Sequence, residues 1–394
     1  MVQAVLLAAG ASTRTLPLTR TRPKPLLPIL RKPLLEHQLE QVAGLVDEVI
    51  LVVGYRGEAI RQRFGERFGN LPLRYVEQEP QRGTADALAR AAPFIRQRAL
   101  ILNGDDLYHA QDLRALLRHR TALLVAHAAD PQNRGVVTIS GDQVIDVVEK
   151  PASAPAQALV SVGGYTLEKE LLAFLEDIKP SPRGELELPD LIRAVARRVP
   201  VRYHRVERIW LPLTYAWDVL TSTEHLLSDP SRAAEFGVSV PGLAQLKARR
   251  DVNLGVGTVI EGPVLVGAGV TFGSFCRIRG PAVIDSGCTF GDRVEVERSV
   301  FMKSARVGEF AQVRDSVLGD LVRIGAGANL RSQARPGTTL VAEVQGKKLD
   351  TGLARLGLIA GDGAIVPDGA VLPPASMLEP GETFGESTKK DEVA

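Results

Sequence analysis

Short apolar runs alternate with amphipathic stretches from the start of the chain to about residue 225. The apolar runs predict buried strands at Ala4–Ala9, Glu48–Val53, Leu73–Glu77 and Ala99–Leu102. The amphipathic stretches predict helices at Leu34–Leu45, Glu58–Phe64, Thr84–Ala92 and Leu113–His119. This alternation predicts an α/β domain, in which helices cover both faces of a mostly parallel sheet. Such sheets bind ligands beyond the carboxyl ends of their strands.

A second pattern begins at residue 251, where apolar residues recur at every sixth position. One series comprises Leu254, Ile260, Val266, Phe272, Ile278, Ile284, Phe290, Val296 and Met302. Glycines such as Gly255 and Gly267 follow several of these residues and supply the permissive backbone that a tight corner needs. Short strands that turn every six residues predict a parallel β-helix. The register slips between residues 303 and 318 and resumes at Val322.

The segment between the two patterns carries helix-start and break signals, and it predicts a linker. We therefore predict an α/β domain at 1–228, a linker at 229–250, a β-helix at 251–380 and a tail at 381–394. A chain of 394 residues is also long enough for two domains.

Composition and charge narrow the function. The 48 basic and 46 acidic residues leave a net charge of +2, which gives no electrostatic reason to expect a nucleic-acid partner. No apolar run approaches the roughly 18 residues of a membrane span, and no basic segment precedes the run Ala4–Ala9 as in a signal peptide. The two cysteines, Cys276 and Cys288, form no framework, which favours a reducing cytoplasm.

The strongest chemical motif is a small-residue loop directly after the first predicted strand. It comprises Leu7, Ala8, Ala9, Gly10, Ala11, Ser12, Thr13 and Arg14, and residues 23–29 follow it as Pro-Lys-Pro-Leu-Leu-Pro-Ile. Small residues let backbone N–H groups approach phosphate oxygens, and Arg14 and Lys24 add two positive charges. Such a loop alone is equally typical of a structural turn, but the two cations at this spacing favour phosphoryl transfer.

These residues resemble the opening signature of the sugar nucleotidylyltransferases, with Ser12 where the second glycine usually stands. The resemblance covers almost the whole chain and includes enzymes that join this domain to a left-handed β-helix, as in bifunctional N-acetylglucosamine-1-phosphate uridylyltransferases. It implies a Rossmann-like nucleotidyltransferase domain followed by a left-handed β-helix of hexapeptide repeats. It also implies that residues 7–14 bind the nucleotide and that Arg14, Lys24 and Asp105 are catalytic.

Later motifs follow in the family's order. Gln78, Gly83 and Thr84 resemble the segment that reads the pyrimidine base, and a glutamine offers the donor and acceptor that uracil or thymine requires. Asp105, in Asn-Gly-Asp, matches the family's Mg²⁺ ligand; magnesium needs only one or two carboxylates beside the substrate phosphates. The sugar phosphate is expected to contact Gly135, Glu149, Lys150 and Ser161.

The sequence departs from the family at two places. Ser161 stands where the family has asparagine, and Pro212 stands where the family's Trp-x-Asp places the second metal ligand. A proline side chain cannot coordinate a metal, so Asp218 is the candidate substitute. Residues 184–190, Gly-Glu-Leu-Glu-Leu-Pro-Asp, resemble the acidic motif that frames the sugar pocket.

The main hypothesis is an enzyme that joins an NTP, dTTP or UTP, to glucose-1-phosphate or N-acetylglucosamine-1-phosphate and releases pyrophosphate. One alternative is a non-catalytic regulatory homologue, which Pro212 and Ser161 favour. Another is a bifunctional enzyme with an acetyltransferase in the β-helix. The family resemblance also implies a homo-oligomer, with a trimer favoured.

The acetyltransferase of the bifunctional relatives uses a histidine base, and all six histidines here precede the β-helix: His37, His109, His119, His127, His204 and His225. The resemblance aligns Glu309 with that histidine, Gln312 with a tyrosine and Arg355 with a lysine. We therefore expect a β-helix without acetyltransferase activity.

Overall fold

The computed structural model describes residues 1–386, and the predicted tail at 381–394 lies mostly outside these residues. The chain packs as two compact units. The first comprises residues 1–11, 23–26 and 34–212, and the second comprises residues 12–22, 27–33 and 213–394. Two short N-terminal segments, 12–22 and 27–33, therefore pack with the C-terminal half of the chain.

The first unit is built on a sheet that runs in the order β10-β11-β13-β9-β12-β7-β1-β4-β6-β5. These strands are β1 Val2–Ala8, β4 Glu48–Val53, β5 Arg67–Phe68, β6 Leu71–Glu77, β7 Arg98–Asn103, β9 Ala122–His127, β10 Gly135–Ser140, β11 Gln143–Glu149, β12 Leu159–Glu168 and β13 Val201–Arg205. The four neighbours β7, β1, β4 and β6 are parallel, which confirms the predicted sheet at its centre. Beyond β7 the sheet is mixed, because β12 runs antiparallel to β7 and β9.

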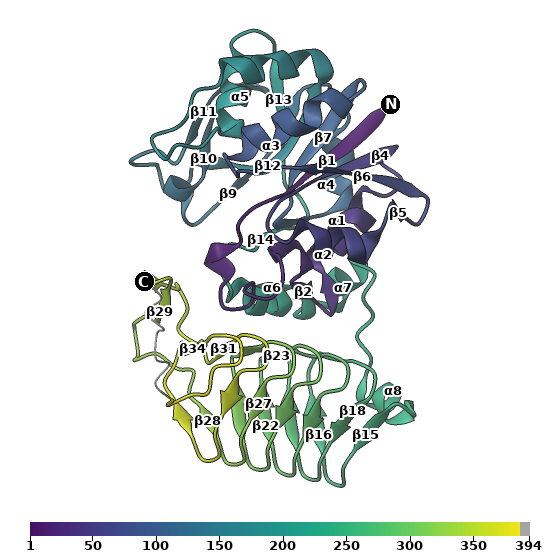
Figure 1. Cartoon of the computed structure of the whole chain (residues 1–394), viewed down its shortest axis with the longest axis vertical. Helices are drawn as coiled ribbons and strands as arrows, with labels where there is room; N and C mark the ends of the chain where they lie inside the picture. Colours follow the sequence, from purple (N-terminus) through teal and green to yellow (C-terminus); the bar gives the residue numbers. More distant parts are fainter. Residues whose placement is uncertain (387–394) are drawn as a thin grey trace. The chain divides into compact units, whose positions relative to one another are not determined.

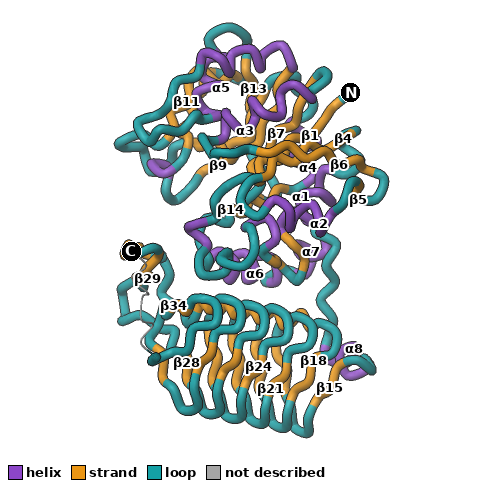
Figure 2. The backbone as a smooth tube through the Cα atoms, viewed as in Figure 1, coloured by secondary structure: helices purple, strands orange, loops and turns teal. Residues whose placement is uncertain are grey.

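Helices cover both faces of this sheet, as predicted (Figures 1 and 2). Alternate residues of β1 enter different cores: Ala4 and Leu6 pack with one cluster, whereas Val5 packs with another. The helices are α1 Leu34–Val42, α2 Gly57–Phe64, α3 Thr84–Ala91, α4 Ala110–Leu116 and α5 Leu188–Ala196. The first cluster includes residues of α1, α2 and α4, and the second includes residues of α3 and α5. Strands that are apolar on both faces are what a doubly covered parallel sheet requires.

The C-terminal part of the second unit is a left-handed β-helix of three all-parallel sheets, as predicted (Figure 1). The first sheet comprises β15 Val252–Leu254, β18 Val270–Phe272, β21 Thr289–Phe290, β24 Arg306–Val307, β27 Arg323–Ile324 and β32 Ile365–Val366. The second comprises β16 Val259–Glu261, β19 Arg277–Arg279, β22 Glu295–Glu297, β25 Gln312–Arg314, β28 Asn329–Leu330 and β33 Val371–Leu372. The third comprises β17 Val264–Val266, β20 Ala282–Ile284, β23 Val300–Phe301, β26 Val317–Leu318, β31 Ile359–Ala360 and β34 Met377–Leu378.

The break in the sequence repeat reflects shorter coils, and a separate insertion interrupts the β-helix further along the chain. Val264 pairs with Ala282 but Val283 pairs with Val300, so the coil shortens by one residue at that point. A longer interruption lies between β28 and β31, where the antiparallel hairpin of β29 Val341–Val344 and β30 Lys347–Asp350 is inserted. A strict six-residue period therefore holds only over the first coils.

Three helices precede the β-helix in the second unit: α6 Asp218–Leu227, α7 Pro230–Glu235 and α8 Leu243–Ala248. Helix α6 contacts β20 and β23 of the third sheet, whose residues are buried. Leu246 of α8 is buried in the apolar core of the β-helix. The segment 229–250 thus contains ordered helices, one of which contributes to this core.

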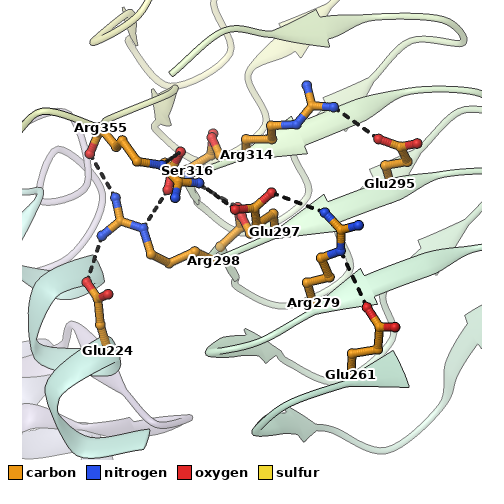
Figure 3. Close-up of polar contacts among 11 residues, drawn as sticks. Glu224, Glu261, Arg279, Glu295, Glu297, Arg298, Arg314, Ser316 and Arg355 are labelled. Atoms are coloured by element: carbon orange, nitrogen blue, oxygen red, sulfur yellow. Dashed lines mark hydrogen bonds and ion pairs between the residues drawn. The ribbon is translucent and has the colours of Figure 1, made fainter. Parts of the chain in front are cut away.

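Helix α6 is joined to the β-helix by a polar cluster around the buried Asp315 (Figure 3). Arg298 contacts Glu224 of α6 at 2.7 Å and Asp315 at 2.5 Å, and Arg355 bonds the other oxygen of Asp315 at 3.1 Å. The Asp315 side chain has no solvent exposure, whereas the nearby Glu261 side chain is 49% exposed. The two guanidinium groups therefore neutralise a carboxylate that is removed from water.

We predict that Asp315→Asn lowers the free energy of unfolding by about 3 kcal/mol, because it removes the charge of a fully buried carboxylate that pairs with both Arg298 and Arg355. Glu261→Gln should cost less than about 1 kcal/mol, because its ion pairs are exposed. Urea denaturation followed by circular dichroism measures both changes. Equal losses in the two variants would contradict a structural role for the cluster.

Candidate active site

The small-residue loop and Asp105 meet at the carboxyl end of β1. The Gly104 N–H donates to the Leu7 carbonyl at 2.9 Å, and a Cβ atom on Gly104 would lie 2.6 Å from that oxygen. A Cβ atom on Gly54, after β4, would similarly lie 2.6 Å from the Ala9 carbonyl. Glycine at both positions lets the loops after β4 and β7 approach β1 closely.

Lys24 and Asp105 form the central ion pair of the first unit. The Lys24 Nζ lies 2.7 Å from Asp105 Oδ2, and the side chains are 9% and 41% exposed. Lys24 stands in the short 3-10 turn Lys24–Leu26 and is held at the sheet edge although it is far from Asp105 in sequence. The structure thus brings two of the three predicted catalytic residues into contact.

Asp106 is a neighbouring carboxylate that the sequence interpretation missed. It accepts hydrogen bonds from Trp210 Nε1 and from the Tyr108 hydroxyl, each at 3.2 Å. Burial, and then the charge of Asp105, raise the pKa of Asp106 to about 7. In the pairing of β8 Asp106–Tyr108 with β14 Trp210–Pro212, Asp106 lies opposite Pro212. The Asp-Asp doublet after a buried strand was the available signal.

Arg134 adds positive charge beside this carboxylate. Its guanidinium lies 4.9 Å from the centre of the Trp210 ring, and its charge lowers the pKa of Asp106, although burial and Asp105 outweigh it. Arg134 also bonds Asp130 at 2.9 Å. Arg134 immediately precedes Gly135, so it stands in sequence beside the predicted sugar site.

Gln78 is buried and organises the loop that contains Gly83. Its Nε2 donates to the Gly83 carbonyl at 2.9 Å and to Asp86 Oδ2 at 2.8 Å. Gly83 has φ of 106°, and a Cβ atom there would lie 2.4 Å from the Leu186 carbonyl. The Thr84 hydroxyl accepts the N–H of Leu188 at 3.0 Å. The three predicted base-reading residues are thus adjacent, with both Gln78 donors used within the loop.

The four predicted sugar-phosphate residues gather on β10, β11 and β12. Gly135 pairs with Glu149 on one side and with Ser161 on the other, and Lys150 follows Glu149. The Ser161 hydroxyl donates to the Tyr165 hydroxyl at 2.8 Å. A Cβ atom on Gly135 would lie 3.1 Å from Glu149 Oε2, so glycine leaves this carboxylate uncovered.

Arg183 and Glu187, which come from the acidic motif and its preceding residue, complete this cluster. Arg183 bonds Glu187 at 2.5 Å and lies 3.7 Å from Glu149. Burial and the charge of Glu187 raise the pKa of Glu149, and Lys150 and Arg183 oppose that rise. The sequence interpretation quoted the motif but did not assign roles to these two residues.

Four further predicted site residues, Ser12, Thr13, Arg14 and Asp218, belong to the second unit. Arg14 is exposed in a short 3-10 turn, after Ser12 in the left-handed conformation. Asp218 Oδ2 accepts the backbone N–H groups of Thr214 and Tyr215 at 2.6 and 2.7 Å. That carboxylate therefore caps the turn that begins α6.

The partly exposed Asp105 carboxylate is of the kind that binds a divalent cation beside substrate phosphates, whereas Oδ2 of the buried Asp106 already accepts two hydrogen bonds. Within residues 1–386 no group of three or more His, Cys, Asp or Glu side chains is arranged to hold a metal.

Among the same residues no helix has the length and apolar character needed to cross a bilayer.

A doubly covered α/β sheet with a small-residue loop and a lysine–aspartate pair at its carboxyl edge defines a phosphate-handling enzyme. Residues 3–222 match the family model described as nucleotidyl transferase, and residues 260–386 match the GMPPB C-terminal domain. The chain belongs to the nucleotidyl transferase family and is a sugar-1-phosphate nucleotidylyltransferase. The non-catalytic alternative is therefore set aside.

The relatives extend over both units. The bifunctional protein GlmU of Methanocaldococcus jannaschii is 31% identical over 92% of this chain and 88% of its own length. A bifunctional sugar-1-phosphate nucleotidylyltransferase/acetyltransferase of Sulfurisphaera tokodaii is 29% identical over 91% and 90%. The structure of a putative glucose-1-phosphate thymidylyltransferase from Bacillus anthracis covers 61% of this chain and 98% of its own, with 22% identity and a TM-score of 0.52. This last likeness concerns the fold alone.

Proposed function

We propose that the chain transfers a nucleotidyl group from dTTP or UTP to glucose-1-phosphate or N-acetylglucosamine-1-phosphate. The contact between Lys24 and Asp105 carries this proposal, because it sets a cation and a metal-binding carboxylate beside the small-residue loop. Glu149 and Arg183, which lie 3.7 Å apart, supply hydrogen-bonding groups for a sugar.

In the proposed reaction a sugar-phosphate oxygen attacks the α-phosphorus of the NTP. A new phosphorus–oxygen bond forms, the bond to the bridging β-oxygen breaks, and pyrophosphate leaves. The protein's share is positioning and charge neutralisation. Arg14 stabilises the charge of the triphosphate, while Lys24 contacts phosphates of both substrates. The lysine is preorganised because Asp105 holds its ammonium group.

Magnesium is the cation we propose, held by Asp105 with Asp106 beside it. When bound, it neutralises charge on the phosphates. Asp218 remains the candidate second ligand, although two backbone N–H groups already occupy one of its oxygens.

The sugar phosphate contacts Gly135, Glu149, Lys150 and Ser161 in this proposal. Glu149 accepts hydrogen bonds from sugar hydroxyls, and Lys150 faces the phosphate. A serine hydroxyl at 161 replaces an amide, so the sugar contact at this position differs from that of the family. UTP and dTTP differ by one methyl group, worth only about 1 kcal/mol, so both belong to the proposal. We also expect a cytoplasmic homotrimer.

Removal of either cation should slow the reaction by orders of magnitude. We predict that Lys24→Ala and Arg14→Ala each reduce Mg²⁺-dependent pyrophosphate release at least about 100-fold, since charge neutralisation is the main catalytic contribution. A panel of NTPs and sugar 1-phosphates identifies the pair to assay. Arg306→Ala, an exposed arginine of the β-helix, is the matched control and should keep full activity. Undiminished turnover in both site variants would refute the site.

The proposed metal ligation predicts different effects of substitution at Asp105 and at Asp218. Asp105→Asn should abolish activity at millimolar Mg²⁺, because it removes the accessible carboxylate at the sheet edge. Asp218→Asn should matter only if Asp218 is the second ligand, since an asparagine oxygen still caps the turn. Activity is titrated against Mg²⁺ concentration in each variant, and equally severe losses would establish two carboxylate ligands.

A bifunctional enzyme is the second candidate function, and the names of the relatives favour it. Against it, Glu309, which the family resemblance aligns with the histidine base, is an exposed carboxylate. Arg355, aligned with a lysine, is committed to Glu297 at 2.6 Å and to Asp315 at 3.1 Å.

We therefore predict no thiol release from acetyl-CoA with glucosamine-1-phosphate. A thiol-trapping assay measures this, with the Sulfurisphaera tokodaii relative as the reference protein. Turnover above background that disappears on Glu309→Gln would establish the bifunctional alternative.

A further inference from the structure

Carboxylates of the β-helix hold the segment that follows the small-residue loop. Arg22 Nη2 donates to Asp320 Oδ2 at 2.8 Å and to Asp362 Oδ2 at 2.6 Å, and the Thr21 hydroxyl donates to Asp362 Oδ2 at 2.6 Å. Arg20 bonds Glu379 at 3.0 Å. The three acceptors follow β26, β31 and β34, which are successive strands of the third sheet, so they lie along one corner.

The coils themselves orient the two aspartates. Asp362 Oδ1 accepts the backbone N–H of Asp320, and Asp320 Oδ1 accepts the backbone N–H of Lys303, both at 2.8 Å. The Arg22 side chain is 17% exposed, so its pairing is shielded from solvent, whereas that of Arg20 is half exposed. Arg22 is therefore the principal anchor, because exposed ion pairs contribute little.

Hydrogen bonds within the anchored segment connect it to the predicted phosphate-binding turn. The hydroxyls of Thr15 and Thr19 both donate to the Ser12 carbonyl, at 3.0 and 2.6 Å, and lie 3.1 Å from each other. Both threonines are buried. Arg14 stands between Ser12 and these threonines in sequence.

We propose that Asp320 and Asp362 are positioning residues for the nucleotide: by holding Arg22 they fix residues 12–22, and with them Arg14, in the conformation that receives the triphosphate. The β-helix thus takes part in NTP binding without touching the NTP. This inference rests on the proposed function. Asp320 and Asp362 have no role in sugar binding in this proposal, because the sugar-phosphate residues Glu149 and Lys150 belong to the first unit.

The test is the double variant Asp320→Asn/Asp362→Asn, which keeps side-chain size and the oxygens that accept backbone N–H groups. We expect the KM for the NTP to rise about tenfold and the KM for the sugar phosphate to stay unchanged, since a small misplacement of a binding group is costly. The control is Asp292→Asn/Asp368→Asn, whose carboxylates accept the N–H groups of Ser274 and Ala326 but do not contact residues 12–22. Equal KM values for the NTP in both double variants, or equal rises for both substrates, would overturn the proposal.

Arg22→Gln removes the same ion pairs by changing the N-terminal segment, and it leaves the β-helix unchanged. This variant therefore tests the positioning role even if the double variant does not fold. It should raise the KM for the NTP by the same factor. Where both fold, combining the changes should add nothing further, because they remove one interaction. A wild-type KM in Arg22→Gln, or additive effects, would overturn the proposal.

A failure of the proposed function is separable from a failure of this inference. If the wild-type protein releases no pyrophosphate with any substrate pair, calorimetric titration with dTTP and UTP still measures nucleotide affinity. Weaker binding in Arg22→Gln than in Asp292→Asn/Asp368→Asn then supports the positioning role. Equal affinities, or no binding by the wild-type protein, would contradict it.

Discussion

The site depends on a close approach of backbone segments at the carboxyl end of β1. Gly54 and Gly104 leave no side chain between the loops after β4 and β7 and the carbonyl groups of Leu7 and Ala9. Any larger residue at either position would push these loops outward. Because Gly104 is held against β1, Asp105 reaches the ammonium group of Lys24, and the small-residue loop shares the same edge.

Charge in the first unit is arranged as carboxylates beside cations. Lys24 contacts Asp105, the charge of Arg134 lowers the pKa of Asp106, and Arg183 bridges two glutamates. Burial raises the pKa of a carboxyl group and a neighbouring cation lowers it, so each local balance sets the charge available to a substrate. Positioned groups of this kind act on transferred phosphates without covalent chemistry.

The β-helix also pairs carboxylates with cations, and these pairs hold helix α6 and the N-terminal segment against it. Its inner positions are apolar, and acidic side chains at its corners bind arginines of the β-helix itself and of the N-terminal segment. Asp315 accepts Arg298, which also reaches helix α6, and Asp362 accepts Arg22 from the N-terminal segment. Because one corner residue recurs per coil, a periodic fold can present a column of anions at a fixed spacing.

The sequence alone determined the two architectures and supplied most of the residues of the candidate site. Apolar runs of period and length typical of buried strands predicted the sheet, and the six-residue repeat predicted the β-helix, because both signals are local. Motif order likewise brought Lys24 and Asp105 into one hypothesis. The mixed outer half of the sheet, the burial of Asp106 opposite Pro212, and the anchoring of Arg22 by Asp362 were decided only in the tertiary structure. These features depend on pairings between residues far apart in the chain, which no local pattern encodes.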